Sequence, residues 1–318
     1  MKQLCLLLLA CSLLLACTGQ APLAPNAIQL NNSGISALAS GDLTTAHAKF
    51  SVALEYHPRF VDAHVNLALV HLRRGNLHLA EKHLRRAVRI NRHIAQPHHG
   101  LGLLEEQRGR HDRAEKHYLQ ALRVDPGFAP SRANLARIYF ETERFDDARE
   151  QFLRLTHTSS DSPHGYVGLA ESLYRLGRRQ QAAAVITAAL AKLGREHPLM
   201  QLHAARLALD SNHLPEAQRL LHPLLQLPGP TGRDAWAWLG VTYLVSGNLR
   251  RAQHCAKRAL QYDRHHSLAT YVLAMALHEQ HHPMAKTWLQ RAKQLNPTNS
   301  TVAYAIESAA SFLPTASH

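Results

Sequence analysis

The sequence predicts an all-α protein built as an α-solenoid of about eight helix-turn-helix repeats. Three observations predict this class: alanines at a constant spacing, glycines five positions before most of them, and an aromatic content of only 6%. The alanines follow one another every 34 residues and then continue with one-residue slips. They are Ala46, Ala80, Ala114, Ala148, Ala182, Ala217, Ala252 and Ala285.

The first helix of each repeat is marked by a second small residue, twelve positions before the alanine. Two antiparallel helices approach closely only where the side chains at their crossing are small. Large residues must then fill the surrounding volume, and a leucine precedes most of these small residues. The small residues are Gly34, Ala68, Gly102, Ala136, Ala170, Ala205, Gly240 and, after a one-residue deletion, Ala274.

The turn and the second helix have their own markers. A glycine between the helices suits the left-handed residue that closes a helix. A proline ends some second helices before the next repeat begins. The glycines are Gly41, Gly75, Gly109, Gly177 and Gly247, and the prolines are Pro58, Pro126 and Pro297.

The pattern resembles the tetratricopeptide repeat. Its clearest copy is Trp236-x2-Leu239-Gly240-x2-Tyr243, and the resemblance covers residues 27–299. It implies a right-handed superhelix. Residues 300–318, with apolar side chains at helical spacing, are predicted to form a capping helix and tail. The stretch 228–233 (Pro-Gly-Pro-Thr-Gly-Arg) is predicted to loosen one joint of the array.

The N-terminus predicts export and a lipid anchor. An apolar run too short to span a bilayer fits a signal peptide over residues 1–16. Leu14-Leu15-Ala16-Cys17 resembles the bacterial lipobox, which implies acylation of Cys17, with residues 17–26 as the lipidated cysteine and tether. The alternative is an ordinary signal peptide with an incidental cysteine.

The expected location is the cell envelope. No aspartate follows Cys17, which by the same resemblance implies an outer-membrane lipoprotein that faces the periplasm. A net charge of +13 attracts nucleic acid, anionic lipid or acidic protein alike. Because export is predicted and no nucleic-acid-binding motif accompanies the charge, we expect membrane contact through the lipid and no nucleic-acid partner.

One motif suggests an enzyme. His278-Glu279-Gln280-His281-His282 matches H-E-x-x-H, the pattern of zinc peptidases, with His278, Glu279 and His282 in the active roles. Its position argues against catalysis, because it falls at the predicted end of a first helix and Pro283 follows at once. We therefore predict no catalytic residue, no metal site and no cofactor.

The predicted binding surface is the groove that first helices line in the resembled family. Its positions offer arginine forks for acidic groups and aromatic anchors of the kind enriched at interface hot spots. The predicted groove residues are Asn66, His99, Asn134, Arg137, Phe140, Tyr174, Arg206, Trp238 and Tyr271.

An exported, lipid-anchored repeat array resembles the pilotin lipoproteins, which assist secretin assembly and stability in type IV pilus systems. This implies a non-catalytic scaffold or chaperone whose partner is a secretin or pilus subunit. The departure is that those proteins carry fewer repeats and a cysteine pair in the array, whereas the mature chain here has only Cys255. The alternative is a scaffold for another envelope machine, in cytochrome maturation, polysaccharide export or cell-wall synthesis.

Overall fold

The computed structural model describes residues 24–194 and 196–295, and the predicted all-α repeat fold is confirmed over them. These residues form sixteen α-helices, one 3₁₀ helix and no strand. The predicted signal peptide (1–16), Cys17 and the predicted cap (300–318) lie outside the described residues. Within the described part, no helix is both long and apolar enough to cross a bilayer.

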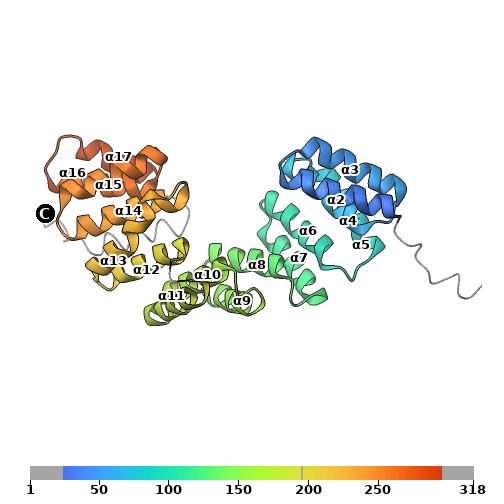
Figure 1. Ribbon diagram of the computed structural model, residues 1–318, viewed down its shortest axis with the longest axis horizontal. Helices are drawn as coiled ribbons and strands as arrows, with labels where there is room; N and C mark the ends of the chain where they lie inside the picture. Colours follow the sequence, from blue (N-terminus) through green and yellow to red (C-terminus); the bar gives the residue numbers. More distant parts are fainter. Residues whose placement is uncertain (1–23, 195, 296–318) are drawn as a thin grey trace, which may run out of the picture. The chain divides into compact units, whose positions relative to one another are not determined.

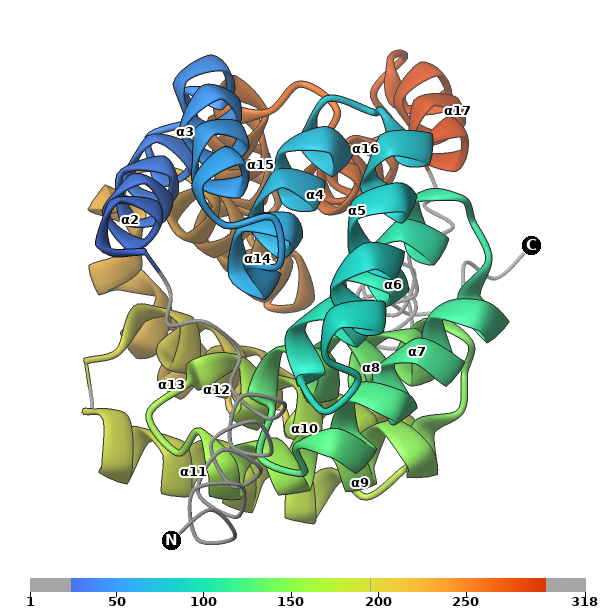
Figure 2. The same ribbon diagram turned by 90° about the vertical axis from the view of Figure 1, so that its right-hand side faces the viewer.

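The helices alternate as first and second members of eight pairs (Figure 1). The chain divides into unit 1, which ends at Ser131, and unit 2, which begins at Arg132. Unit 1 contains α2 (Pro25–Ala39), α3 (Leu43–Tyr56), α4 (Val61–Arg73), α5 (Leu77–Ile90), α6 (Ala95–Gln107) and α7 (His111–Val124), and the division falls within α8 (Ala129–Glu141). In unit 1, α2 lies beside α3, α4 beside α5 and α6 beside α7 (Figure 2).

Unit 2 continues the same alternation with one irregular pair. It contains α9 (Phe145–Thr158), α10 (Pro163–Arg175), α11 (Arg179–Leu193), α12 (Pro198–Asp210), α13 (Leu214–Leu221), the 3₁₀ helix η1 (His222–Gln226), α14 (Pro230–Val245), α15 (Leu249–Tyr262), α16 (Ser267–Glu279) and α17 (Ala285–Gln294). First helices of consecutive pairs also pack on each other, as α10, α12, α14 and α16 do in turn.

The turn inside every pair has one geometry. The second residue after the first helix is left-handed, and its N–H and the next N–H donate back into the last helical turn, as in Gly41 to Leu38 and Asp42 to Ala37. This is the Schellman closure, which glycine adopts without strain. Three pairs lack the glycine and still use it, at about 1 kcal/mol each. Those residues are Glu143, Asn212 and His281.

Where a glycine lies at the helix crossing, an aromatic ring of the second helix packs directly against it. A Cβ at Gly34 would lie 2.5 Å from the Phe50 ring, and a Cβ at Gly102 would lie 2.3 Å from the Tyr118 ring. Both rings are fully buried. The predicted role of the small residues as sites of close helix approach is therefore confirmed in these pairs.

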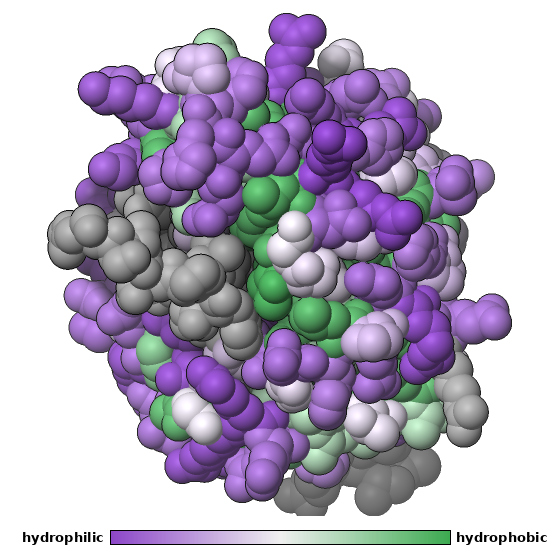
Figure 3. Space-filling view, turned by 90° about the vertical axis from the view of Figure 1, so that its left-hand side faces the viewer, coloured by the Kyte–Doolittle hydropathy of each residue, from purple (hydrophilic) through white to green (hydrophobic). Residues whose placement is uncertain are grey.

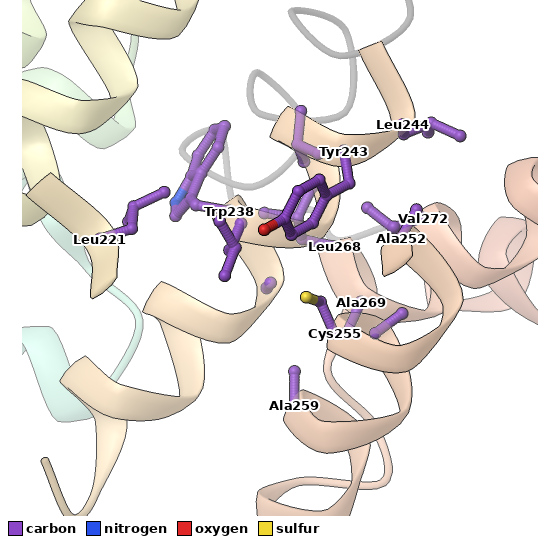
Figure 4. Close-up of a cluster of buried hydrophobic side chains, with 14 of the residues drawn as sticks. Leu221, Trp238, Tyr243, Leu244, Ala252, Cys255, Ala259, Leu268, Ala269 and Val272 are labelled. Carbon is purple, nitrogen blue, oxygen red and sulfur yellow. The ribbon is translucent and has the colours of Figure 1, made fainter. Parts of the chain in front are cut away.

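The prediction that residues 228–233 loosen a joint is wrong. Pro230 begins α14, and Gly232 packs so closely on the Leu227 carbonyl that a Cβ would lie 1.9 Å from its oxygen. Leu221 and Leu224 belong to the same apolar core as Trp238, and this core extends to residues of α16 (Figure 4). A glycine without a side chain allows this tight turn, so the joint is filled with packed apolar groups.

Candidate functional site

The predicted groove residues all lie on the first helices of their pairs, and they fall into two exposure classes. Asn66 (α4), His99 (α6), Asn134 and Arg137 (both α8), and Tyr271 (α16) are half-buried. Phe140 (α8), Tyr174 (α10), Arg206 (α12) and Trp238 (α14) are buried.

Three of these residues come together in unit 2. The guanidinium carbon of Arg206 lies 5.7 Å from the centre of the Tyr174 ring and 5.9 Å from that of the Trp238 ring. They meet because α10, α12 and α14 pack successively, and their spacing of 32 residues places each about one helical turn earlier in its first helix than the one before. Cations over aromatic faces are favourable, by about 0.5–2 kcal/mol. These residues form one cluster.

The centre of this cluster is an ion pair that the sequence analysis missed. Two nitrogens of Arg206 donate to the two carboxylate oxygens of Glu171, at 2.5 and 2.8 Å. His203 Nδ1 lies 3.3 Å from the same carboxylate. The sequence contained an indication of this pair. Arg137, Glu171 and Arg206 are spaced by 34 and 35 residues, so one repeat position carries a positive, a negative and again a positive charge in three consecutive repeats.

Burial and pairing set the charges of this ion pair. Burial acts to raise the pKa of the Glu171 carboxyl, but the charge of Arg206 and hydrogen bonds from His203 and Arg206 hold that pKa well below its usual range. Burial also acts to lower the pKa of Arg206, and Glu171 raises it instead. Both groups therefore remain ionised at neutral pH.

Tyr174 and Asp210 extend the network. Burial raises the pKa of Tyr174 to about 12, and a hydrogen bond to Asp210 and the charge of Asp210 act in the same direction. Arg206 was predicted to bind acidic groups of a partner, but its guanidinium is occupied by the carboxylate of Glu171. Partner binding by Tyr174, Arg206 and Trp238 stays a prediction. In it, Arg206 holds the rings of Tyr174 and Trp238 in place and does not bind a carboxylate of the partner.

Arg137 is in a different environment. It donates to both oxygens of Glu141, one turn along α8, at 2.9 and 2.8 Å, and both side chains are more than 40% exposed. An exposed pair of this kind contributes only a few tenths of a kcal/mol, so a partner's carboxylate can replace Glu141 at small cost.

Other predicted groove residues make internal contacts. Asn66 donates to the Asn31 side-chain oxygen at 3.0 Å, across consecutive first helices. His99 Nδ1 lies 3.1 Å from Ser131 Oγ, and burial lowers the pKa of His99 to about 4. The Phe140 ring packs edge-on against Phe145, and burial raises the pKa of Tyr271.

The H-E-x-x-H match is split by a turn. Helix α16 ends at Glu279, and His281 is the left-handed residue of the closure. His278, Glu279 and His282 therefore do not share one helical face. Between residues 24 and 295, leaving out 195, no three or more side chains of metal-binding type are grouped to hold an ion.

Family models described as tetratricopeptide repeat match residues 60–127, 106–171, 163–186, 202–249 and 239–300. The chain is a tetratricopeptide repeat protein. Such repeats form scaffolds for protein–protein contact. The matched segments contain every predicted groove residue and the Glu171–Arg206 pair.

Solved structures share the fold at low sequence identity. A tetratricopeptide repeat protein from Parabacteroides merdae has a TM-score of 0.57 at 15% identity, over 80% of this chain and 100% of that one. PilF from Pseudomonas aeruginosa has a TM-score of 0.54 at 20% identity, over 64% of this chain and 92% of that one. No curated protein matches this chain in sequence.

Proposed function

We propose that this repeat protein is a non-catalytic scaffold that holds a protein partner along its first-helix surface. The observation that carries the proposal is the repeat fold whose first helix α8 presents the exposed Arg137–Glu141 pair. Beneath the same first-helix surface, the buried cluster of Tyr174, Arg206 and Trp238, held by the ion pair to Glu171, fixes α10, α12 and α14 to each other. A surface that is already ordered loses little conformational entropy when it binds. Aromatic and arginine side chains are also those that dominate binding energy at interfaces.

The proposed setting is the periplasmic side of an outer membrane. The lipobox supports acylation of Cys17, and the short segment 18–26 would then tether the array to the bilayer. Anchoring raises the effective concentration of the binding surface for a partner that reaches the same membrane. The combination of lipobox and repeat array, together with a fold shared with PilF, supports a secretin of a type IV pilus system as that partner.

The anchor is tested by Cys17→Ala, with Cys11→Ala as the matched control because Leu8-Leu9-Ala10-Cys11 is the weaker lipobox match. We expect Cys17→Ala to move the protein from the membrane fraction to the soluble fraction and Cys11→Ala to leave it in the membrane. A Cys17→Ala protein that stays membrane-bound and processed as before contradicts the anchor.

The binding surface is tested by in-cell photo-crosslinking from Arg137, whose side chain is exposed enough to be replaced without disturbing the core. Arg85, 66% exposed on the second helix α5, is the control position. Capture of a secretin from Arg137 but not from Arg85 supports the proposal. Capture of another envelope protein keeps the scaffold and refutes the pilus assignment, and equal capture from both positions refutes the groove.

A further inference from the structure

The face drawn in Figure 3 is mainly hydrophilic, with apolar residues among the polar ones. A second candidate surface lies in unit 2. It is a cavity of about 460 Å³ between η1, α14 and α15. Its lining residues are His222, Leu225, Trp236, Leu239, Tyr243, Arg250, Arg251, His254 and Cys255. We call this cavity the Trp236 pocket.

The Trp236 pocket is separate from the first-helix groove. Residues two apart on a helix differ by about 200° in direction, so Trp236 and the groove residue Trp238 point to nearly opposite sides of α14. Leu239 and Tyr243, three and seven positions after Trp236, lie on the Trp236 side. A change in one surface therefore need not alter the other.

The pocket exists because one second helix is short. Helix α13 has eight residues, whereas α11 and α15, the second helices of the neighbouring pairs, have 15 and 14. Pro223 lacks the N–H that would continue the α-helix, and the chain passes into η1 instead. The 3₁₀ helix packs on α14, and its residues His222 and Leu225 form one wall of the pocket.

The floor of the pocket is apolar and holds an unsatisfied donor. Leu239 and Cys255 are each 2% exposed, and burial raises the pKa of the Cys255 thiol to about 12, so the thiol behaves as an apolar group. The indole N–H of Trp236 is buried and has no hydrogen-bond partner in the described part of the chain. Buried indole N–H groups usually have an acceptor, so this one is a polar group left unpaired in the wall of the pocket.

The rim is cationic. Arg250, Arg251 and His254 line it, and no carboxylate does. Arg251 lies over the Tyr243 ring at 5.5 Å, and Arg258 lies over the Trp236 ring at 5.3 Å. From Arg250 to Arg258 this row follows α15 for about 12 Å, which is the length of about four residues of extended peptide.

We propose that the Trp236 pocket binds an acidic, extended peptide segment of a partner protein, with one large apolar side chain in the cavity and carboxylates on the arginines of α15. The row of cations complements such a segment along its length, whereas a single lipid headgroup would cover only one end of it.

The test uses the full-length chain and a fluorescent ten-residue peptide, with two central leucines flanked by glutamates, in an anisotropy titration. Arg250→Glu and Arg251→Glu together reverse the rim charge. Arg86→Glu and Arg89→Glu together are the matched control, because both residues are exposed on α5 in unit 1 and the change in net charge is the same. Far-UV circular dichroism checks that each variant is folded, and the same peptide with glutamines in place of glutamates reports the contribution of charge.

We expect saturable binding that weakens about tenfold or more in the Arg250, Arg251 double variant and with the glutamine peptide, and much less in the Arg86, Arg89 control. Absence of saturable binding to the unaltered protein overturns the proposal, and so does an equal loss in the Arg86, Arg89 control. Binding to phosphatidylglycerol vesicles that depends on Arg250 and Arg251, without peptide binding, would also overturn it in favour of a lipid surface. The peptide titration is independent of the crosslinking test of the groove, so a failure to capture a secretin from Arg137 would not change its outcome.

Discussion

Replacing Glu171 with leucine removes the carboxylate that neutralises Arg206, whose side chain is only 7% exposed. A buried charge left without its partner typically costs 3–5 kcal/mol of unfolding free energy. Asp210 also attracts Arg206 and offsets part of this cost, so we expect the low end, about 3 kcal/mol. Glu141→Leu is the control because its exposed pair with Arg137 contributes about 0.5 kcal/mol or less.

The assay is urea unfolding followed by tryptophan fluorescence. The three tryptophans of the chain, at positions 236, 238 and 288, all lie in unit 2, which also contains Glu171 and Arg206. The signal therefore reports the unit in which the change is made, even if unit 1 unfolds separately.

The double variant Glu171→Leu with Arg206→Met separates a lost pairing from a packing defect. Apolar residues of similar volume can replace a buried ion pair with little loss, so we expect the double variant to recover most of the stability lost by Glu171→Leu. Our reasoning is refuted if Glu171→Leu costs no more than Glu141→Leu. It is also refuted if the double variant is as unstable as the sum of the two single changes.

Three further predictions concern other sites. Burial lowers the pKa of His83 to about 4, and neighbouring histidines and Lys82 add to this. The unfolded chain binds protons from about pH 6.5 downward, whereas folded His83 binds them only near pH 4. Stability is therefore complete above pH 6.5 and falls as the pH drops towards 4, by about 1–2 kcal/mol because His83 is partly screened by solvent. His83→Gln should reduce this fall in circular-dichroism melts across that range, whereas His78→Gln, at an exposed site, should not. Gly102→Ala should destabilise unit 1 by about 1–3 kcal/mol in urea unfolding, since its Cβ would overlap the buried Tyr118 ring, and a neutral result contradicts the rigid packing. Cys255, buried with a raised pKa, should react with a maleimide at pH 7 only after urea is added.

The repeat period alone determined most of the fold. Helix pairs of fixed length place a small residue at each crossing and a left-handed residue at each turn, so alanine and glycine spacing was enough to predict both. The same period identified which positions lie on first helices, and all nine predicted groove residues do. The repeat period could not show that Glu143, Asn212 and His281 adopt the left-handed conformation that glycine has in the other turns. At these residues the packing of the surrounding helix pair determines the backbone conformation.

Tertiary packing decided what the side chains of the site do. Arg206 was predicted to offer its donors to a partner, and only the packing of α12 on α10 brings Glu171 within hydrogen-bond distance of them. Likewise, Pro223 is visible in the sequence, but the Trp236 pocket depends on how far α13 extends beside α14. Local sequence governs helix and turn because those contacts lie within a few residues. Pairing across about 35 residues depends on distances that exist only in the packed array.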